Sequence, residues 1–131
     1  MNDGMAEDTG KLILRVTLGV LFLMHGIHKL INGIGGIEGM LAGAGLPAFL
    51  AYGVYVGEVL APILVILGWH SRVGAAVIAF TMVVAIALAH STQFFDLTGN
   101  GGWALELQGM FLFSAVAIAL MGPGRLSINN R

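Results

Sequence analysis

Four long apolar stretches occupy most of this chain of 131 residues. They cover roughly residues 12–31, 48–69, 73–90 and 103–121. A helix needs about 20 apolar residues to span the hydrocarbon of a bilayer at about 1.5 Å per residue, and each stretch is close to that length. The sequence therefore predicts an all-α membrane protein built as a bundle of four transmembrane helices.

The composition excludes several classes of function. Charged residues make up 10% of the chain, against roughly 25% in an average soluble domain. There are only six Lys and Arg residues, too few for a phosphate-binding surface, so we expect no nucleic-acid partner. Cysteine is absent, which excludes disulfides, thiolate metal ligands and dithiol redox chemistry.

The basic residues predict how the chain crosses the membrane. Only Lys29 lies toward one side of the predicted spans, and the other five lie toward the opposite side: Lys11, Arg15, Arg72, Arg125 and Arg131. The positive-inside rule then places both termini in the cytoplasm. We expect a flexible acidic tail over residues 1–10, a transmembrane domain over 11–121 and a cytoplasmic tail over 122–131.

Ionisable residues inside the apolar stretches mark the candidate site. These residues are Arg15, His25, Lys29, Glu58, His90 and Glu106. A charge near the middle of a bilayer costs about 3 kcal/mol on insertion scales, so such groups usually face a bundle interior and pair with one another. On a helical wheel Arg15, His25 and Lys29 share one stripe, which predicts that this face points inward. At the ends of that stripe, Arg15 is interpreted as an anchor that snorkels to the cytoplasmic surface, and Lys29 could snorkel outward.

Glu58 is the only carboxylate deep in a span, so it must be neutral or paired across helices with Lys29 or Arg15. Pro62 has no amide hydrogen, so the Glu58 carbonyl loses its helical partner, and we expect a kink and an extra acceptor there. Tyr55, one turn earlier, supplies a hydroxyl on the same face. Both a ligand pocket and a structural ion pair are consistent with this pattern.

Three further features remain open to more than one interpretation. His25 and His28 have the spacing of two metal ligands, but the adjacent Lys29 would repel a cation, so we expect no metal and interpret His28 as an interfacial residue. His90 and Glu106 lie at similar depth, where they could relay protons, bind a head group or simply pin two helix ends. The glycine-rich segment 32–47 is either a short interfacial helix or a flexible external loop.

Several short motifs together resemble the DoxX family of four-helix membrane proteins. They are Arg15 with the run Phe-Leu-Met-His-Gly-Ile-His-Lys at 22–29, Glu58 followed by Gly-Trp-His-Ser-Arg at 68–72, Ala-His at 89–90, Gly-Trp-Ala-Leu-Glu at 102–106 and Gly-Pro-Gly-Arg-Leu-Ser at 122–127. The resemblance implies that the polar set of the family falls on Arg15, Lys29, Glu58, His90 and Glu106. The C-terminal run departs from the family pattern, because Ser127 is followed by Ile128 and Asn129 instead of Leu-Asp.

The resemblance also implies a place and a function. Some members of the family are linked to quinone-coupled sulfur oxidation or to membrane redox-defence complexes. We therefore expect a multi-pass protein of a bacterial or archaeal plasma membrane, surrounded by lipids, homo-oligomeric, and acting as the membrane subunit of a redox or stress-response complex. The chain has no catalytic signature of its own, so a soluble oxidoreductase partner would supply the chemistry.

Quinone is the expected ligand of an outward-facing pocket, because it needs an apolar slot and a few polar groups for its carbonyls. The candidate ligand-binding residues are Glu58, Tyr55, His90, Glu106, Lys29, His25 and Arg15. Two alternatives of other classes stay open. The chain could be a small proton-coupled transporter, or a structural assembly factor whose polar network only holds the bundle.

Overall fold

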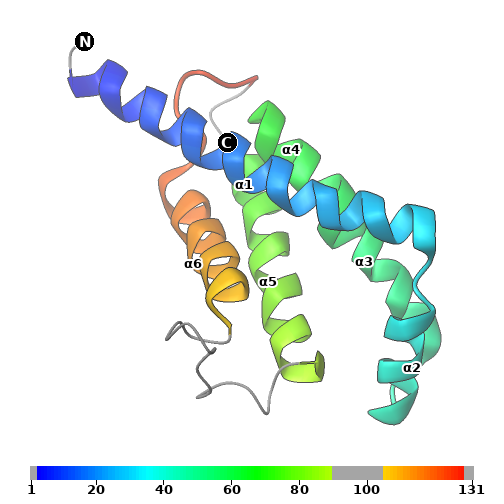
Figure 1. The fold of residues 1–131 in the computed structure, drawn as a ribbon. Helices are drawn as coiled ribbons and strands as arrows, with labels where there is room; N and C mark the ends of the chain where they lie inside the picture. Colours follow the sequence, from blue (N-terminus) through cyan, green and yellow to red (C-terminus); the bar gives the residue numbers. More distant parts are fainter. Residues whose placement is uncertain (1–2, 90–104, 129–131) are drawn as a thin grey trace.

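The computed structural model describes residues 3–89 and 105–128, with the side chains of residues 88 and 89 left out. Within these residues every regular element is helical (Figure 1). Four elements are uninterrupted α-helices, namely α1 (Asp3–Asn32), α2 (Gly35–Gly43), α5 (Ser71–Ala89) and α6 (Glu106–Met121). The second apolar stretch is composite, with a 3-10 turn η1 (Ala48–Tyr52), α3 (Gly53–Tyr55), a π turn η2 (Val56–Leu60) and α4 (Ala61–Leu67).

Two helical segments are long and apolar enough to cross a membrane, namely Asp3–Asn32 and Ala48–Leu67. The apolar helices Ser71–Ala87 and Glu106–Met121 are shorter within the described residues. The four apolar stretches therefore all form helices, and length and composition mark the first two as candidate spans.

Helix α1 begins earlier than the sequence predicts. Residues 3–10, expected to be part of a flexible tail, form its first turns. Asp3 lies in the first turn, where a negative charge is favourable beside the helix N-terminus. Asp8 also accepts a hydrogen bond from the backbone amide of Arg125 at 3.2 Å. The C-terminal segment thus fixes a part of α1 that lies outside the apolar stretch.

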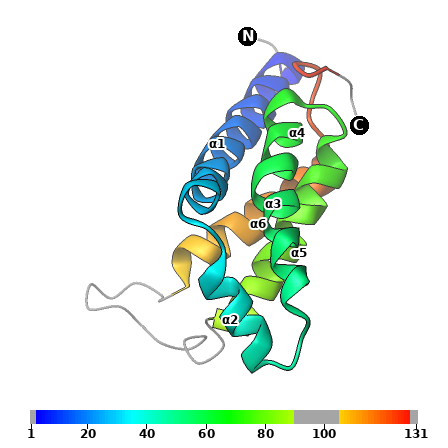
Figure 2. The same cartoon turned by 90° about the vertical axis from the view of Figure 1, so that its right-hand side faces the viewer.

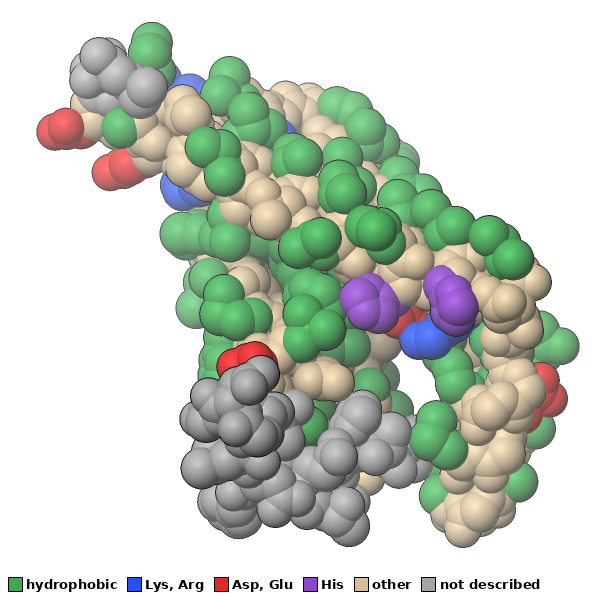
Figure 3. All heavy atoms as spheres, in the orientation of Figure 1, with side chains coloured by type: hydrophobic (Ala, Val, Ile, Leu, Met, Phe, Trp, Pro, Cys, Tyr) green, Lys and Arg blue, Asp and Glu red, His purple; other side chains and the backbone are tan. Residues whose placement is uncertain are grey.

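Apolar side chains both fill the interior and cover the outside of the bundle. The core between α1, α4, α5 and α6 includes Phe22, Val65, Ile78 and Ile118. On the outside, Phe80, Phe113 and Leu120 are each at least 65% exposed, and green side chains cover much of the face in Figure 3. Among the described residues, the buried polar ones are Arg15, Glu58 and Ser71. A polar interior within an apolar surface is the pattern of a bundle surrounded by lipid.

The glycine-rich segment forms helix α2 and not an extended loop. Ile34 and Leu41 are buried against Ala51 of η1 in a second, smaller apolar cluster. Figures 1 and 2 show α2 folded back beside the start of the composite stretch. The helical alternative of the sequence analysis is the one the structure adopts.

The two ends of the described chain meet at the end of the bundle opposite α2 (Figure 1). Arg125 Nε lies 3.3 Å from the Asp8 carboxylate, and the Ile128 amide donates to the carbonyl of Leu67 at the end of α4. Arg72, at the start of α5, donates to the carbonyls of Leu120 and Met121 and so caps the end of α6. These contacts hold the start of α1, the end of α4 and the end of α6 at one level.

Candidate functional site

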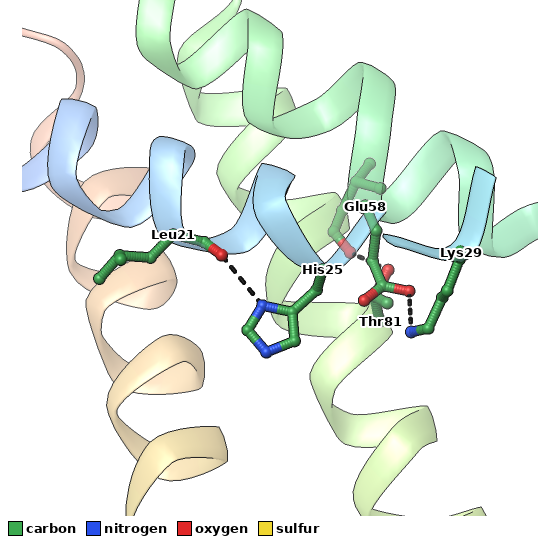
Figure 4. A network of polar contacts seen from close by, with 6 residues as sticks. Leu21, His25, Lys29, Glu58 and Thr81 are labelled. Atoms are coloured by element: carbon green, nitrogen blue, oxygen red, sulfur yellow. Dashed lines mark hydrogen bonds and ion pairs between the residues drawn. The ribbon is translucent and has the colours of Figure 1, made fainter. Parts of the chain in front are cut away.

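The centre of the candidate site is an ion pair between α1 and the π turn. Lys29 Nζ lies 2.5 Å from Glu58 Oε2. The Glu58 side chain is 4% exposed and that of Lys29 is 30% exposed. Figure 4 shows Lys29 reaching from α1 to the carboxylate. Of the two states expected for Glu58, neutral or paired across helices, the structure shows the paired one, and its partner is Lys29 and not Arg15.

The π turn follows from the missing amide hydrogen of Pro62. A regular helix would join the amide of residue 62 to the carbonyl of Glu58, and proline cannot make this bond. Instead the chain widens by one residue before Pro62, and the Ala61 amide donates to the carbonyl of Val56. The disturbance predicted from Pro62 is thus present as a π turn that carries Glu58.

Gly26 allows α1 to lie directly against this turn. A Cβ atom at Gly26 would lie 2.1 Å from the Glu58 carbonyl oxygen, which is far closer than any real contact. The acceptor that Pro62 leaves without a helical partner therefore faces the backbone of α1. We expected the Glu58 carbonyl to be a free hydrogen-bond acceptor at a kink. Instead the backbone of α1 covers it, and this close approach is possible because Gly26 has no side chain.

His25 lies one turn before Lys29 on the same side of α1 (Figure 4). Its Nδ1 donates to the carbonyl of Leu21 at 2.9 Å, since a carbonyl can only accept. The ring packs edge-on against Phe111 of α6, with centroids 5.6 Å apart. Because Nδ1 carries the proton in the neutral ring, Nε2 is left as the acceptor, and the residue is exposed.

Helix α5 contributes a hydroxyl that the sequence analysis missed. Thr81 Oγ1 donates to the carbonyl of Val77 at 2.8 Å and lies 2.1 Å from the position that a Cβ of Gly57 would take. Thr81 is therefore packed against the residue that precedes Glu58. A lone threonine inside an otherwise apolar helix was the signal in the sequence that could have found it.

Tyr55 is placed away from the ion pair. It packs against the apolar cluster around Leu41, and its ring centroid lies 6.3 Å from that of Tyr52. No hydrogen bond joins it to Glu58 in the part of the chain that the structure describes. The wheel that put both residues on one face assumed a regular helix, and the wider π turn between them changes their angular offset.

Arg15 corrects a second expectation, because it does not snorkel. It is 2% exposed and donates to the carbonyls of Ile66 at 3.2 Å and Pro123 at 3.4 Å, and also to that of Leu126. Carbonyls at a helix end and in the following segment lack intrahelical partners, so a buried guanidinium can satisfy several of them. Arg15 lies 14 residues before Lys29, about 21 Å along α1, and so is not brought to the ion pair.

The remaining candidate residues are placed as follows. Glu106 is exposed in the first turn of α6, and His90 lies outside the described residues, so their predicted pairing stays a prediction. His28 is exposed, and its Nδ1 lies 3.1 Å from the Asn32 amide nitrogen. Among the residues described, no group of three or more His, Cys, Asp or Glu side chains is arranged to hold a metal ion.

Charged and histidine side chains border an open space. Figure 3 shows a hollow beneath the C-terminal half of α1 and beside α2, with histidine, basic and acidic side chains at its upper edge. A proton donor on Lys29 and an acceptor on His25 thus lie next to apolar helix surfaces. This arrangement can bind a small molecule that combines carbonyl or hydroxyl groups with an apolar body.

Comparison with known proteins identifies relatives over nearly the whole chain. The DoxX family model matches residues 10–91. The putative oxidoreductase CatD of Bacillus subtilis (strain 168) is 30% identical over 122 residues, covering 93% of this chain and 86% of the relative. The inner membrane protein YphA of Escherichia coli (strain K12) is 28% identical over 137 residues, covering 98% and 94%. No solved structure matches the chain.

Proposed function

Since the chain belongs to the DoxX family of membrane proteins, we propose that it is the membrane subunit of a redox complex and binds a quinone beside the Lys29–Glu58 pair. The subunit crosses the plasma membrane four times, with both termini in the cytoplasm. A soluble oxidoreductase partner supplies the electrons, since the chain has no cysteine.

This proposal rests on the unequal exposure of the two side chains in the ion pair. Glu58 is buried, while Lys29 keeps 30% of its side chain exposed, so the pair presents a partly accessible cation whose charge is already balanced. A balanced cation can donate a hydrogen bond to a quinone carbonyl without leaving an isolated charge in an apolar site. His25 and Phe111 add an acceptor and an aromatic surface at the same place.

The chemistry needs protons as well as a binding slot. A quinone that takes two electrons from the partner must also take two protons to become a quinol. The Glu58 carboxylate and the His25 ring nitrogen are the nearby groups whose chemistry allows them to accept and donate a proton. Lys29 would orient the carbonyl, and these two groups would pass protons to it.

Further support comes from the relatives and the topology. The relative from Bacillus subtilis is named as a putative oxidoreductase, and that from Escherichia coli as an inner membrane protein. The start of α1 and the C-terminal segment are joined by Asp8 and Arg125, as an even number of crossings requires. Basic residues at that same end favour a cytoplasmic position.

The test is the substitution Glu58→Gln, which keeps the shape of the side chain and removes its charge. At equal abundance in native membranes, we expect the reduction rate of an added short-chain quinone to fall by about tenfold, roughly the loss of one charge-assisted contact. Glu38→Gln in α2 is the matched control and should leave the rate unchanged. An unchanged rate in Glu58→Gln would contradict the proposal.

A structural assembly factor is the second candidate, favoured by the depth of Glu58 and the close approach at Gly26. The exchanged pair Lys29→Glu with Glu58→Lys separates the two functions. If the pair only holds the bundle, the exchange should restore both abundance and activity relative to the single variants. If it binds quinone, abundance should recover while activity stays low, because the buried and exposed charges have changed places.

A further inference from the structure

A charged cleft lies at the opposite end of α1 from the Lys29–Glu58 pair. It has a volume of about 300 Å³ and lies between the first turns of α1 and the segment that follows α6. A second cleft of about 440 Å³ adjoins it and shares Glu7, Lys11 and Met121 in its lining. The first volume lies at the lower end of the range of about 300–1,000 Å³ that small-molecule sites occupy.

The cleft holds two charges that the described chain does not pair. Asp8 and Arg125 neutralise each other at 3.3 Å. Glu7 and Lys11 also line the cleft, but within residues 3–89 and 105–128 neither forms an ion pair. Residues four apart on a helix have Cβ atoms about 5–6 Å apart, so a carboxylate and an ammonium stand side by side without closing on each other.

The position of the cleft fits the headgroup level of a bilayer. Figure 3 shows acidic and basic side chains gathered at the N-terminal end of α1, next to the apolar surface of the bundle. Lys11 comes directly before the first apolar stretch, and Met121 ends the last one. A bound amphiphile could therefore place a polar group among the charges while its chains follow the helices.

We propose that this cleft binds the headgroup of a phospholipid that carries both a phosphate and a primary amine, as phosphatidylethanolamine does. Lys11 donates to the phosphate oxygens, and Glu7 accepts from the lipid ammonium. Met121, common to both clefts, lies where the first carbons of the acyl chains would pass. The site is independent of the quinone proposal, because it uses none of the same residues.

The test is lipid binding by the delipidated full-length protein in a nonionic detergent, followed by native mass spectrometry. Phosphatidylethanolamine, phosphatidylcholine and phosphatidylglycerol are added separately at equal concentrations. We expect phosphatidylethanolamine to bind most tightly, because the quaternary ammonium of choline cannot donate a hydrogen bond and the glycerol headgroup has no cation for Glu7. Lys11→Gln and Glu7→Gln should each weaken its binding by about tenfold.

Two controls keep the result specific. Lys11→Arg retains the cation and should retain binding, while Glu38→Gln removes a carboxylate from α2 and should have no effect. Equal binding of the three lipids, tighter binding of phosphatidylglycerol, or unchanged affinity in Lys11→Gln would each overturn the proposal. Folding of the variants is checked by circular dichroism, and a Lys11→Gln variant that fails to fold is replaced by Lys11→Met for the same comparison.

Discussion

Gly26 sets the distance between α1 and the turn that carries Glu58. The Glu58 carbonyl oxygen occupies nearly the place of a missing Cβ, so the size of residue 26 controls whether Lys29 can reach its partner. A motif of small residues is commonly interpreted as a close helix contact in membranes. In this chain the contact also has a chemical consequence, because it covers the acceptor released by Pro62.

We predict that Gly26→Ala destabilises the protein by about 1–3 kcal/mol, because the added methyl group must displace backbone and not a flexible side chain. The measurement is the thermal unfolding midpoint of the purified protein in detergent. Gly10→Ala is the control in the same helix, since a Cβ at Gly10 meets nothing within 4 Å. A midpoint in Gly26→Ala as high as in the control would show that α1 does not approach Glu58 this closely.

For single residues, the sequence predicted which side chains need a partner better than it predicted where they lie. A buried, unpaired Glu58 carboxylate would be strongly destabilising, so a partner on another helix could be inferred from the sequence. The same argument failed for Arg15, whose place near a helix end suggested escape to water. Instead it is met inside the protein by the carbonyl of Ile66 in the last turn of α4 and by those of Pro123 and Leu126 beyond α6, and no pattern in the sequence marks that convergence.

The composite stretch from η1 to α4 is the element that shapes the site. Its π turn lies directly before Pro62 and carries both Gly57 and Glu58. Single π turns occur often at functional sites, where they re-aim a side chain without breaking the helix. Pro62 is evident from the sequence, but which residues accommodate the extra residue of the π turn depends on packing against α1 and α5.

We predict that Pro62→Ala lowers quinone-dependent activity by about tenfold at equal abundance, and that it also lowers the thermal midpoint, because a buried Glu58 without its partner is destabilising. Alanine supplies the amide that a regular helix needs, so the π turn should convert to α-helix and rotate Glu58 away from Lys29. Activity and unfolding are measured on the same preparations. Pro47→Ala, at the start of η1, serves as the control, and full activity in Pro62→Ala would contradict a role for the turn.

The helices themselves were largely predictable, but where they begin and which contacts hold their ends were not. Four apolar stretches predicted four helical regions, and the stripe of α1 predicted to face inward is buried at Arg15, Phe22 and Gly26 but exposed at His25. The helical start at Asp3 was missed because acidic residues suggested a solvated tail. The contact of Asp8 with Arg125, more than 100 residues away, supplies the missing stabilisation.

For the whole molecule, the described contacts place the N-terminal turns and the C-terminal segment at one end and α2 at the other (Figure 1). Five of the six basic residues of the chain belong to the end with the termini or to the terminal segment itself. In the orientation we propose, this end lies in the cytoplasm, so that the proposed quinone site would open outward and the proposed lipid cleft would face the cytoplasm.

We predict the labelling pattern of three single-cysteine variants, which is simple to read because the chain has no native cysteine. Gly39→Cys in α2 should react with a membrane-impermeant maleimide in intact cells. Asp3→Cys and Ile128→Cys should react only after the membrane is permeabilised. Opposite behaviour of residues 3 and 128 would require an odd number of crossings, and labelling of all three from outside would contradict the orientation.

Quinone binding beside the Lys29–Glu58 pair can be measured by native mass spectrometry of the protein extracted gently from its own membrane. We predict an adduct with the mass of a quinone in the wild type, lost in Glu58→Gln and kept in Glu38→Gln. A clean homo-oligomer with no adduct and no copurifying partner would contradict the claim and favour transport instead. An adduct that persists in Glu58→Gln would move the quinone away from the Lys29–Glu58 pair.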